Sequence, residues 1–317
     1  IHLIRYEFLE NIGEHMLSVI IPSFNEEKNI PLTAARLSTI LQEAQIEHEL
    51  IFVDDGSLDG TFAAIEEAQI RWPQVRGVKF SRNFGKEPAI MAGLAAAKGS
   101  CCAVIDCDLQ HPPECLPKMY AAWQQGFMIV EGVKASRGKE GWVYKHSAKL
   151  FYKILSRFIG LDLSRASDYK LLDRRVVDLL LKLPEKTMFF RGLSVYFGFS
   201  RAEVEFEVAP RLEGETKWNF SGLFRYAINN ITSFSAVPLQ LITALGVVML
   251  AVFVFLGIQT LYIYLTGNAV EGFTTVILLL LFIGSTLSIS LGIIGHYVAK
   301  IYEEIKGRPM YVVEKTL

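Results

Sequence analysis

The stretch "ELIFVDDGSLDGTFAAIEEAQIRW", residues 49–72, holds a strand pattern, a polar loop and a helix pattern in succession. Residues 50–53 are all apolar, which is typical of a strand buried on both faces of a parallel sheet. After the loop, alanine and isoleucine recur at helical spacing. The stretch therefore predicts one strand–helix unit, with two carboxylates, Asp54 and Asp55, directly at the end of the strand.

The same alternation of strand and helix patterns extends from residue 17 to residue 134. Expected strands are residues 17–23, 49–55, 75–81, 101–108 and 127–134, and helical spacing is clear at residues 30–44 and 59–72. Such alternation predicts an α/β domain with a mainly parallel sheet and helices on both of its faces. Ligands of these sheets bind beyond the carboxyl ends of the strands.

Polar side chains gather where four of these strands end. The segments are "PSFNEE" (22–27), "DDGSLDGT" (54–61), "SRNFGKE" (81–87) and "DCDLQ" (106–110), which bring acids, amides and one lysine to one rim. A buried carboxylate without a partner is costly, so Asp106 and Asp108 indicate a nearby cation. A zinc site of Cys107, His111 and Cys115 fits less well, because the two prolines after His111 suit a loop at the end of a strand.

Two long stretches in the last third of the chain lack charged side chains. No Asp, Glu, Lys or Arg occurs from Tyr226 to Val270 or from Gly272 to Ala299. Each stretch exceeds the roughly 20 apolar residues that span a bilayer. We predict transmembrane helices at residues 236–265 and 273–298, because both are apolar on every face, unlike the buried helices of a soluble core.

The distribution of charge says more than its sum. The formal net charge of −1 excludes a strongly basic nucleic-acid-binding surface, so we expect no nucleic acid as partner. The turn between the two apolar segments has no Lys or Arg, whereas their outer ends are flanked by Lys217, Arg225, Lys300, Lys306, Arg308 and Lys315. By the positive-inside rule, both termini and the large amino-terminal region should face the cytoplasm.

Seven motifs follow one another along most of the chain. They are "VIIPSFNEEKNI", "FVDDGSLDGT", "SRNFGKEPAIMAGL", "DCDLQHPPE", "SDYKLLDRRVVD", "RLEGETKW" and "IYEEIKGRP". In this order they resemble the polyprenyl-phosphate branch of the family 2 glycosyltransferases, which have the nucleotide-diphospho-sugar transferase fold called GT-A. The resemblance covers nearly the whole chain from Leu17 onward.

The resemblance implies four regions. They are a cytoplasmic GT-A catalytic domain at residues 16–212, an amphipathic juxtamembrane helix at 213–234, a two-helix transmembrane domain at 235–300 and a cytoplasmic tail at 301–317. In the juxtamembrane segment, apolar residues fall on one helical face, with Lys217, Trp218 and Arg225 as interfacial anchors. The expected location is the plasma membrane of a bacterial cell, with several passes and the catalytic domain inside.

The resemblance also implies a donor site for a nucleotide sugar. Asp106, Asp108 and Gln110 match the family's D-x-D-x-Q metal site, in which Mg²⁺ or Mn²⁺ takes oxygen ligands and bridges them to a diphosphate. Asp106 would contact the donor, and Asp108 would take part in catalysis. The nucleoside pocket would be lined by Pro22, Phe24, Glu26, Asp54 and Asp55, with Lys86 near the donor.

Residues 131–217 would serve the acceptor. Asp168 stands where the family has its candidate catalytic base, although an Asp at the start of a helix is also a common cap. A lipid phosphate is mostly dianionic at neutral pH, so Asp168 could orient groups instead of abstracting a proton. Arg137, Arg211 and Lys217 match positions near the acceptor phosphate, with Arg211 also counted as catalytic; the alternative is ordinary surface charge.

The function implied is that of an inverting transferase, which moves a sugar from a nucleotide donor to undecaprenyl or another polyprenyl phosphate. Glucose from UDP-glucose is the expected donor sugar, with N-acetylglucosamine, galactose and mannose as alternatives. A separate flippase and a downstream transferase would act on the product, and a homo-oligomer is compatible with the resemblance. Two other functions stay open: a processive polysaccharide synthase of the same superfamily, and a sugar-nucleotide-binding membrane protein without catalysis.

Overall fold

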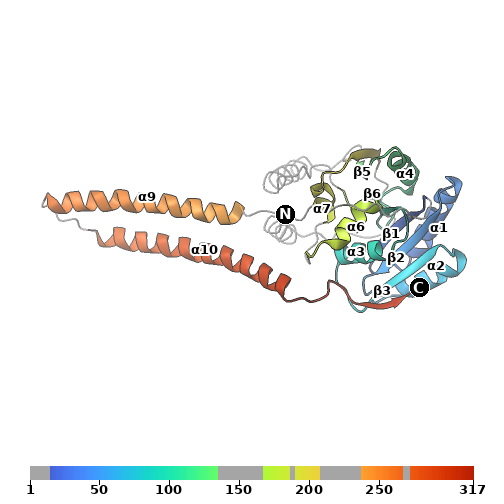
Figure 1. Ribbon diagram of the computed structural model, residues 1–317. Coiled ribbons are helices and arrows are strands. Elements are labelled where there is room, and N and C mark those ends of the chain that lie inside the picture. The colour runs from blue at the N-terminus through green and yellow to red at the C-terminus, as the bar shows by residue number, and fades with distance from the viewer. Residues whose placement is uncertain (1–14, 135–166, 186–189, 208–236, 267–271) are drawn as a thin grey trace. The chain divides into compact units, whose positions relative to one another are not determined.

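The computed structural model describes residues 15–134, 167–185, 190–207, 237–266 and 272–317 (Figure 1). The chain divides into two compact units. The first comprises Ile1–Trp218 together with Pro309–Leu317, and the second comprises Asn219–Arg308. The first unit is an α/β domain and the second contains two long helices.

One mixed sheet forms the centre of the first unit. Its strands are β1 (Leu17–Ser23), β2 (His48–Asp54), β3 (Val75–Phe80), β4 (Cys101–Val104), β5 (Ile129–Lys134), β6 (Lys170–Asp173), β7 (Arg201–Phe206) and β8 (Val313–Thr316). They lie in the order β7-β5-β6-β4-β1-β2-β3-β8. The pairs β1–β2, β1–β4, β2–β3 and β5–β7 are parallel, whereas β6 and β8 run antiparallel to their neighbours. The prediction of a mainly parallel sheet is confirmed.

Helices cover both faces of this sheet, because successive strand residues point to opposite sides. On one face Leu17, Val19 and Ile21 of β1 join a core that contains residues of α1 (Asn29–Glu43), α2 (Thr61–Arg71) and α4 (Leu116–Gln124). On the other face α3 (Lys86–Ala96) lies against β1 and β2, and α6 (Arg174–Lys182) against β4. A Cβ on Gly93 of α3 would lie 2.3 Å from Ile20 Cγ2, so glycine lets this helix approach the sheet closely.

Three strands, β6, β7 and β8, lie outside the predicted set, and the first two lie in the same half of the sheet. β6 has only four residues and carries Lys170 at one end and Asp173 at the other. β7 reads "RAEVEF", with charged side chains at alternate positions, as expected of an edge strand rather than a core strand. Neither shows the apolar run by which the other strands are recognised, so their pairing depends on neighbours distant in sequence.

The segment predicted as a tail, residues 301–317, has a defined structure. Helix α10 (Phe273–Ile305) continues into it, and Val313–Thr316 then forms β8 at the edge of the sheet, antiparallel to β3. Tyr311 stacks on Phe80 with ring centroids 5.0 Å apart, and the backbone N–H of Leu317 donates to the carbonyl of Gly77. A four-residue strand with exposed side chains gives no sequence pattern, which is why it was not predicted.

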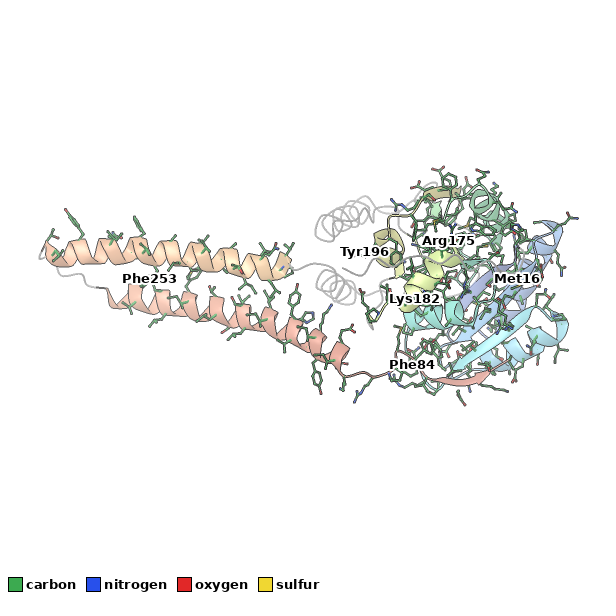
Figure 2. The ribbon with its side chains drawn as sticks, in the orientation of Figure 1. Met16, Phe84, Arg175, Lys182, Tyr196 and Phe253 are labelled. Atoms are coloured by element: carbon green, nitrogen blue, oxygen red, sulfur yellow. The ribbon has the colours of Figure 1, made fainter. Side chains whose placement is uncertain are left out.

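The second unit contains α9 (Val237–Leu265) and α10, which run side by side (Figure 1). Both are long and apolar enough to cross a membrane, over Val237–Gln259 and Phe282–Ile305, and apolar side chains such as Phe253 point outward from them (Figure 2). These two helices match the predicted ranges 236–265 and 273–298 closely at their amino-terminal ends. The predicted amphipathic helix at residues 213–234 lies outside the described residues.

Candidate active site

The predicted site residues come together where the parallel strands end. Asp54 closes β2, Asp106 and Asp108 follow β4, and Lys86 opens α3 after the loop of residues 81–85 that follows β3. Because β6 is antiparallel, its first residue pairs with the last residue of β4, Lys170 with Val104. Asp168, two residues before Lys170, therefore reaches the same edge of the sheet from the opposite direction.

The two carboxylates at the end of β2, Asp54 and Asp55, are buried and have different partners. Asp55 accepts hydrogen bonds from the backbone N–H groups of Phe84 and Gly85, at 2.6 and 2.9 Å, so it holds the loop that leads to Lys86. Gly85 adopts φ 109°, which favours glycine. Burial raises the pKa of Asp55, although these two N–H groups oppose the shift.

Only one carboxylate oxygen of Asp54 has a hydrogen-bond partner among the described residues. Its Oδ1 accepts from the backbone N–H of Ser57 at 2.9 Å, whereas its buried Oδ2 has no hydrogen-bond partner among the described residues. A buried polar atom normally finds a partner, so this oxygen is suited to a hydroxyl or N–H group of a ligand.

The loop after β1 supplies the other residues predicted for the nucleoside pocket. Pro22 is half-buried within β1, and Phe24 is 44% exposed, with its ring available for contact. Glu26 accepts a hydrogen bond from the side chain of Asn29 at 2.5 Å. Burial raises the pKa of Glu26, with the negative charges of Asp108 and Asp106 as further causes.

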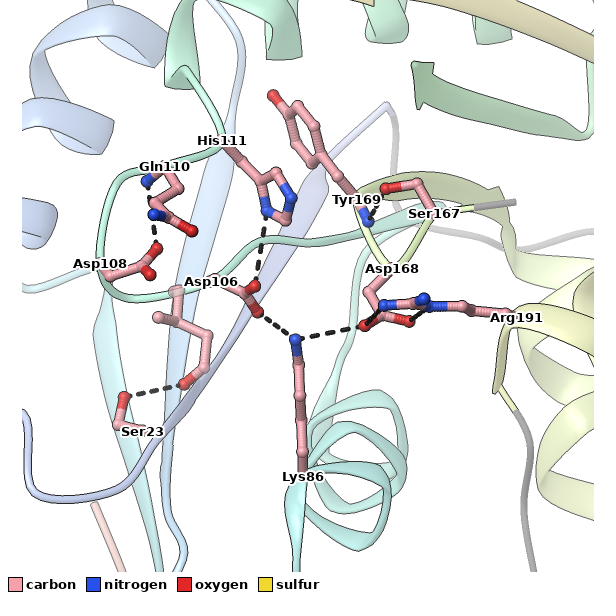
Figure 3. A network of polar contacts seen from close by, with 11 residues as sticks. Ser23, Lys86, Asp106, Asp108, Gln110, His111, Ser167, Asp168, Tyr169 and Arg191 are labelled. Atoms are coloured by element: carbon pink, nitrogen blue, oxygen red, sulfur yellow. Dashed lines mark hydrogen bonds and ion pairs between the residues drawn. The ribbon is translucent and has the colours of Figure 1, made fainter. Parts of the chain in front are cut away.

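Asp106, Asp108 and Gln110 lie on one short loop (Figure 3). Asp108 Oδ1 accepts from the backbone N–H of Gln110 at 3.1 Å. Among the residues that the structure describes, no three His, Cys, Asp or Glu side chains are grouped so that they could hold a metal by themselves. The thiol of Cys107 instead lies 4.0 Å from Thr33 Oγ1 in the core, away from the zinc arrangement considered as the weaker alternative.

This donor set still fits one kind of metal site. Two carboxylates and an amide oxygen are hard ligands, and the excess negative charge at this loop also acts on Glu26. Mg²⁺ is commonly held by one or two carboxylates while substrate phosphates and water complete its coordination. The residues present therefore suit a divalent cation that arrives with a diphosphate, and do not suit a cage built by the protein alone.

Lys86 links this loop to Asp168 (Figure 3). Its Nζ lies 2.5 Å from Asp106 Oδ1 and 3.3 Å from Asp168 Oδ2. Partial burial lowers the pKa of Lys86, but the charges of Asp106 and Asp168 outweigh this effect and raise it. The lysine is thus a charged bridge between two segments, residues 106 and 168, that are distant in sequence.

Arg191 completes the network from helix α7 (Phe190–Tyr196). Its Nε donates to Asp168 Oδ1 at 2.7 Å and its Nη2 donates to Oδ2 at 2.8 Å. Burial alone would raise the pKa of Asp168, but the hydrogen bonds from Arg191 and the charge of Lys86 hold that pKa well below its usual range. Asp168 is therefore a firmly ionised carboxylate with two cationic partners.

Beside this network, Glu87 has the opposite character. It lies in the first turn of α3, next to Lys86. Burial, followed by the negative charge of Asp168, raises the pKa of Glu87 from 4.5 to about 7. The pKa of Glu87 is thus raised while that of the nearby Asp168 is lowered, and such opposite shifts in one site are typical of functional sites.

A second ion pair, between the buried side chains of Lys170 and Glu131, lies next to the residue that precedes Arg191. Lys170 Nζ lies 3.1 Å from Glu131 Oε1 and 5.3 Å from the ring centre of Phe190. The pKa of Lys170 is lowered by burial, with the charge of Glu131 opposing this shift. Because Phe190 precedes Arg191, this contact fixes the start of α7 and hence the position of the guanidinium group.

One alternative considered for this region is wrong, and one prediction is not tested by the described residues. Asp168 is not a helix cap, because β6 lies between it and α6; Asp173 is the cap, and its side chain accepts from the backbone N–H of Arg175 at 3.0 Å. Arg137, Arg211 and Lys217, predicted for the acceptor phosphate, lie outside the described residues.

Arg191, Glu87 and the Lys170–Glu131 pair were missed by the sequence analysis. Each contact joins residues that are far apart along the chain or belong to different elements, such as Arg191 with Asp168. The only available signal was charge inside apolar surroundings, as in "FFRGL" and "DYKLL". A charged residue among apolar ones is expected to have a buried partner, but the sequence does not indicate which residue that partner is.

Comparison with known proteins identifies relatives along most of the chain. The model for glycosyl transferase family 2 matches residues 18–180. An uncharacterized glycosyltransferase of Synechocystis sp. is 39% identical over 302 residues, which cover 94% of each chain. A prophage bactoprenol glucosyl transferase homolog of Escherichia coli is 34% identical, covering 94% of this chain and 98% of that protein. The bactoprenol glucosyl transferase of Shigella phage SfII is also 34% identical, over 95% and 98%.

Solved structures share the fold of the first unit. Glucosyl-3-phosphoglycerate synthase from Mycobacterium tuberculosis, in complex with Mg²⁺ and uridine-diphosphate, has a TM-score of 0.50 and 22% identity. The match covers 69% of this chain and 78% of that one. A second complex of that enzyme, with Mn²⁺, uridine-diphosphate and phosphoglyceric acid, also has a TM-score of 0.50, at 21% identity. At this level of identity the match shows the GT-A-like fold alone.

Proposed function

Because the chain belongs to glycosyl transferase family 2, we propose that it transfers glucose from UDP-glucose to undecaprenyl phosphate or a similar polyprenyl phosphate. One observation carries this proposal. The family model ends at residue 180, but the bactoprenol glucosyl transferases align over 94–95% of the chain, so the alignment extends through the two apolar helices. An acceptor with a long hydrocarbon chain explains why an α/β catalytic unit is joined to such helices.

The donor end of the proposed site consists of the loops after β1, β2 and β4. Asp54 Oδ2, buried and without a partner among the described residues, would accept from the nucleoside, and the ring of Phe24 would contact it. Asp106, Asp108 and Gln110 would hold Mg²⁺ or Mn²⁺ against the diphosphate. When bound, that cation would neutralise the charge that develops on the leaving nucleoside diphosphate.

The acceptor end would need cations for a lipid phosphate. A phosphate monoester has a second pKa of about 6, so it is mostly dianionic at neutral pH and can attack the anomeric carbon without a base. Asp168 is held ionised by Arg191 and Lys86, and it would in turn orient these two side chains. Arg137, Arg211 and Lys217 would bind the phosphate, for which arginine has a suitable bidentate fork.

We further propose that the reaction inverts the sugar. One in-line displacement at the anomeric carbon, with the phosphate oxygen attacking as the diphosphate leaves, turns an α-linked donor into a β-linked product. No protein nucleophile is required in this scheme, in agreement with an Asp168 carboxylate whose two oxygens are both engaged by Arg191.

Both termini and the catalytic unit would face the cytoplasm, where sugar nucleotides are made. The positive charges at the outer ends of the two uncharged stretches support this orientation. A cysteine introduced at Asn268 should react with an impermeant maleimide added to intact cells, whereas one at Ser57 should react only after lysis. The reverse pattern would contradict the orientation. A separate flippase and a downstream transferase would then act on the product.

The decisive experiment uses the purified full-length protein in detergent with undecaprenyl phosphate and four labelled donors: UDP-glucose, UDP-N-acetylglucosamine, UDP-galactose and GDP-mannose. We expect a labelled lipid with UDP-glucose and a β linkage by NMR. Asp108→Ala and excess EDTA should each abolish the product, and added Mg²⁺ should reverse the effect of EDTA. Polymer formation would favour a processive synthase, and nucleotide binding without any turnover would favour a non-catalytic protein.

A further inference from the structure

Lys86 forms ion pairs with two carboxylates, Asp106 and Asp168, which have different proposed roles. Its Nζ lies 2.5 Å from Asp106 Oδ1, on the loop after β4, and 3.3 Å from Asp168 Oδ2, on the segment before β6 (Figure 3). The lysine side chain is 42% exposed, so it has room to move. Asp106 belongs to the proposed metal site, whereas Asp168 belongs to the acceptor side.

A divalent cation and Lys86 would compete for Asp106. Both are attracted to the same carboxylate, and two cations within a few ångströms of each other repel strongly in a partly buried site. A metal that binds Asp106 must therefore overcome the existing ion pair. Lysine differs from arginine in that its ammonium is a compact charge on a flexible stem, which can turn toward another partner.

The second partner is already in contact. Asp168 Oδ2 accepts from both Lys86 and Arg191, so its carboxylate can hold Lys86 without losing the arginine. The matching contact on the metal side is shorter, 2.5 Å against 3.3 Å, which means that Asp106 is the closer of the two partners. A small displacement of Nζ would reverse this order.

We propose that Lys86 is a displaceable counter-cation, which pairs with Asp106 until a divalent cation binds there and is then held by Asp168. This inference rests on the proposed metal role of Asp106 and Asp108. It makes Lys86 a positioning residue that couples the donor side to the acceptor side, because metal binding would bring an additional positive charge to Asp168. The arrival of the metal would thus prepare the site where the acceptor phosphate reacts.

The test measures Mn²⁺ binding to the full-length protein in detergent, by EPR and at one fixed concentration of UDP, because the proposed site needs a diphosphate to complete the coordination of the metal. Lys86→Gln should tighten Mn²⁺ binding about tenfold, the size of one charge-assisted contact. Lys86→Arg keeps the charge but replaces the compact ammonium with a rigid fork, so it should not tighten Mn²⁺ binding. Lys79→Gln is the matched control, since Lys79 also has a carboxylate partner, Glu314 at 3.2 Å, and should leave Mn²⁺ binding unchanged.

A double-mutant cycle separates displacement from simple repulsion. If Asp168 receives Lys86, Asp168→Asn should weaken Mn²⁺ binding in the wild-type background and have little effect in the Lys86→Gln background. If Lys86 stays fixed, Asp168→Asn should weaken binding equally in both, and the proposal is overturned.

Two further results overturn the proposal and distinguish it from the metal assignment. Equal Mn²⁺ affinity of wild type and Lys86→Gln, with binding lost in Asp108→Asn, would reject the counter-cation and leave the metal site in place. Absence of Mn²⁺ binding in both wild type and Lys86→Gln would reject both. Circular dichroism of each variant, compared with wild type, confirms that the protein measured is folded.

Discussion

Arg191 binds the carboxylate of Asp168 through one edge of its guanidinium group, with Nε donating to Oδ1 at 2.7 Å and Nη2 donating to Oδ2 at 2.8 Å. This fork geometry is the strongest that a carboxylate and a guanidinium can form. Burial raises the pKa of Asp168, but the hydrogen bonds from Arg191 and the charges of Lys86 and Arg191 more than offset this, so the pKa lies well below its usual range. The carboxylate is thus a weak base, suited to orienting cations.

Asp168→Asn should reduce kcat/KM by a factor that does not depend on pH. Asp168 stays ionised across the assay range because its pKa is strongly lowered, so only its orienting contacts are lost. We expect a loss of about tenfold to a hundredfold, the size of one or two charge-assisted hydrogen bonds. The measurement is a rate profile from pH of about 5.5 to 8.5, on either side of the second pKa of the acceptor phosphate. Steep recovery of the variant at alkaline pH would instead identify Asp168 as a base.

Arg191→Lys keeps the positive charge but removes the fork. A lysine cannot hold both carboxylate oxygens in fixed geometry, so we expect kcat to fall about tenfold while nucleotide binding stays unchanged. The matched control is Arg175→Lys, because Arg175 also contacts a carboxylate, Asp173, with Nε at 2.7 Å from Oδ1 but at the far end of β6. If both variants lose the same activity, the role of Arg191 is structural rather than specific to the site.

Arg211→Ala tests the proposed acceptor cations. Removing one cation leaves a dianionic phosphate partly unpaired, at a cost of roughly 1.5 to 3 kcal/mol for one charge-assisted contact. We expect kcat/KM for the lipid to fall about tenfold to a hundredfold, with nucleotide-sugar affinity close to wild type. Equal loss of nucleotide affinity would place Arg211 at the donor instead.

Glu87→Gln should stabilise the protein more as the pH rises. The pKa of Glu87 is raised from 4.5 to about 7 by burial and by Asp168, so the folded state holds the proton more tightly than the unfolded state. Stability in wild type is therefore lost as the pH increases between these two values, and a neutral glutamine avoids this loss. The difference in Tm between the variant and wild type should grow from about pH 5 to pH 8.

The baseline for the Glu87 experiment is Glu114→Gln, which removes a surface carboxylate paired with Arg36. A constant difference in Tm between Glu87→Gln and wild type over this pH range would show that Glu87 does not titrate within it.

Tyr311→Ala should loosen the carboxyl-terminal strand from the sheet. The ring of Tyr311 stacks on Phe80, and Phe80 meets Phe84 edge to face at 5.7 Å, next to the loop that Asp55 holds. We expect a loss of about 1 to 2 kcal/mol, from the aromatic pair and part of the buried area. Thermal unfolding checks this, with Tyr196→Ala, a tyrosine 64% exposed, as the control. An unchanged Tm in Tyr311→Ala would mean that the segment is not anchored by this contact.

The sequence alone was sufficient for the elements whose pattern is local. The strands β1 to β5 and helices α1 and α2 follow from apolar runs and helical spacing, and their predicted bounds agree with the structure within a few residues. Helices α9 and α10 follow from uninterrupted apolar composition. The motif order was sufficient for the family, and the acidic strand ends were sufficient to predict that the candidate residues lie at one edge of the sheet.

Tertiary structure alone decided which charges meet. Lys86 and Asp168 are separated by 82 positions, and Arg191 reaches Asp168 from a helix of its own. The short strands β6 and β8 likewise exist only through pairing with β4, β5 and β3. Periodicity records the burial of a segment against its surroundings, whereas an ion pair depends on where the fold brings two distant segments together, so the first can be read along the chain and the second cannot.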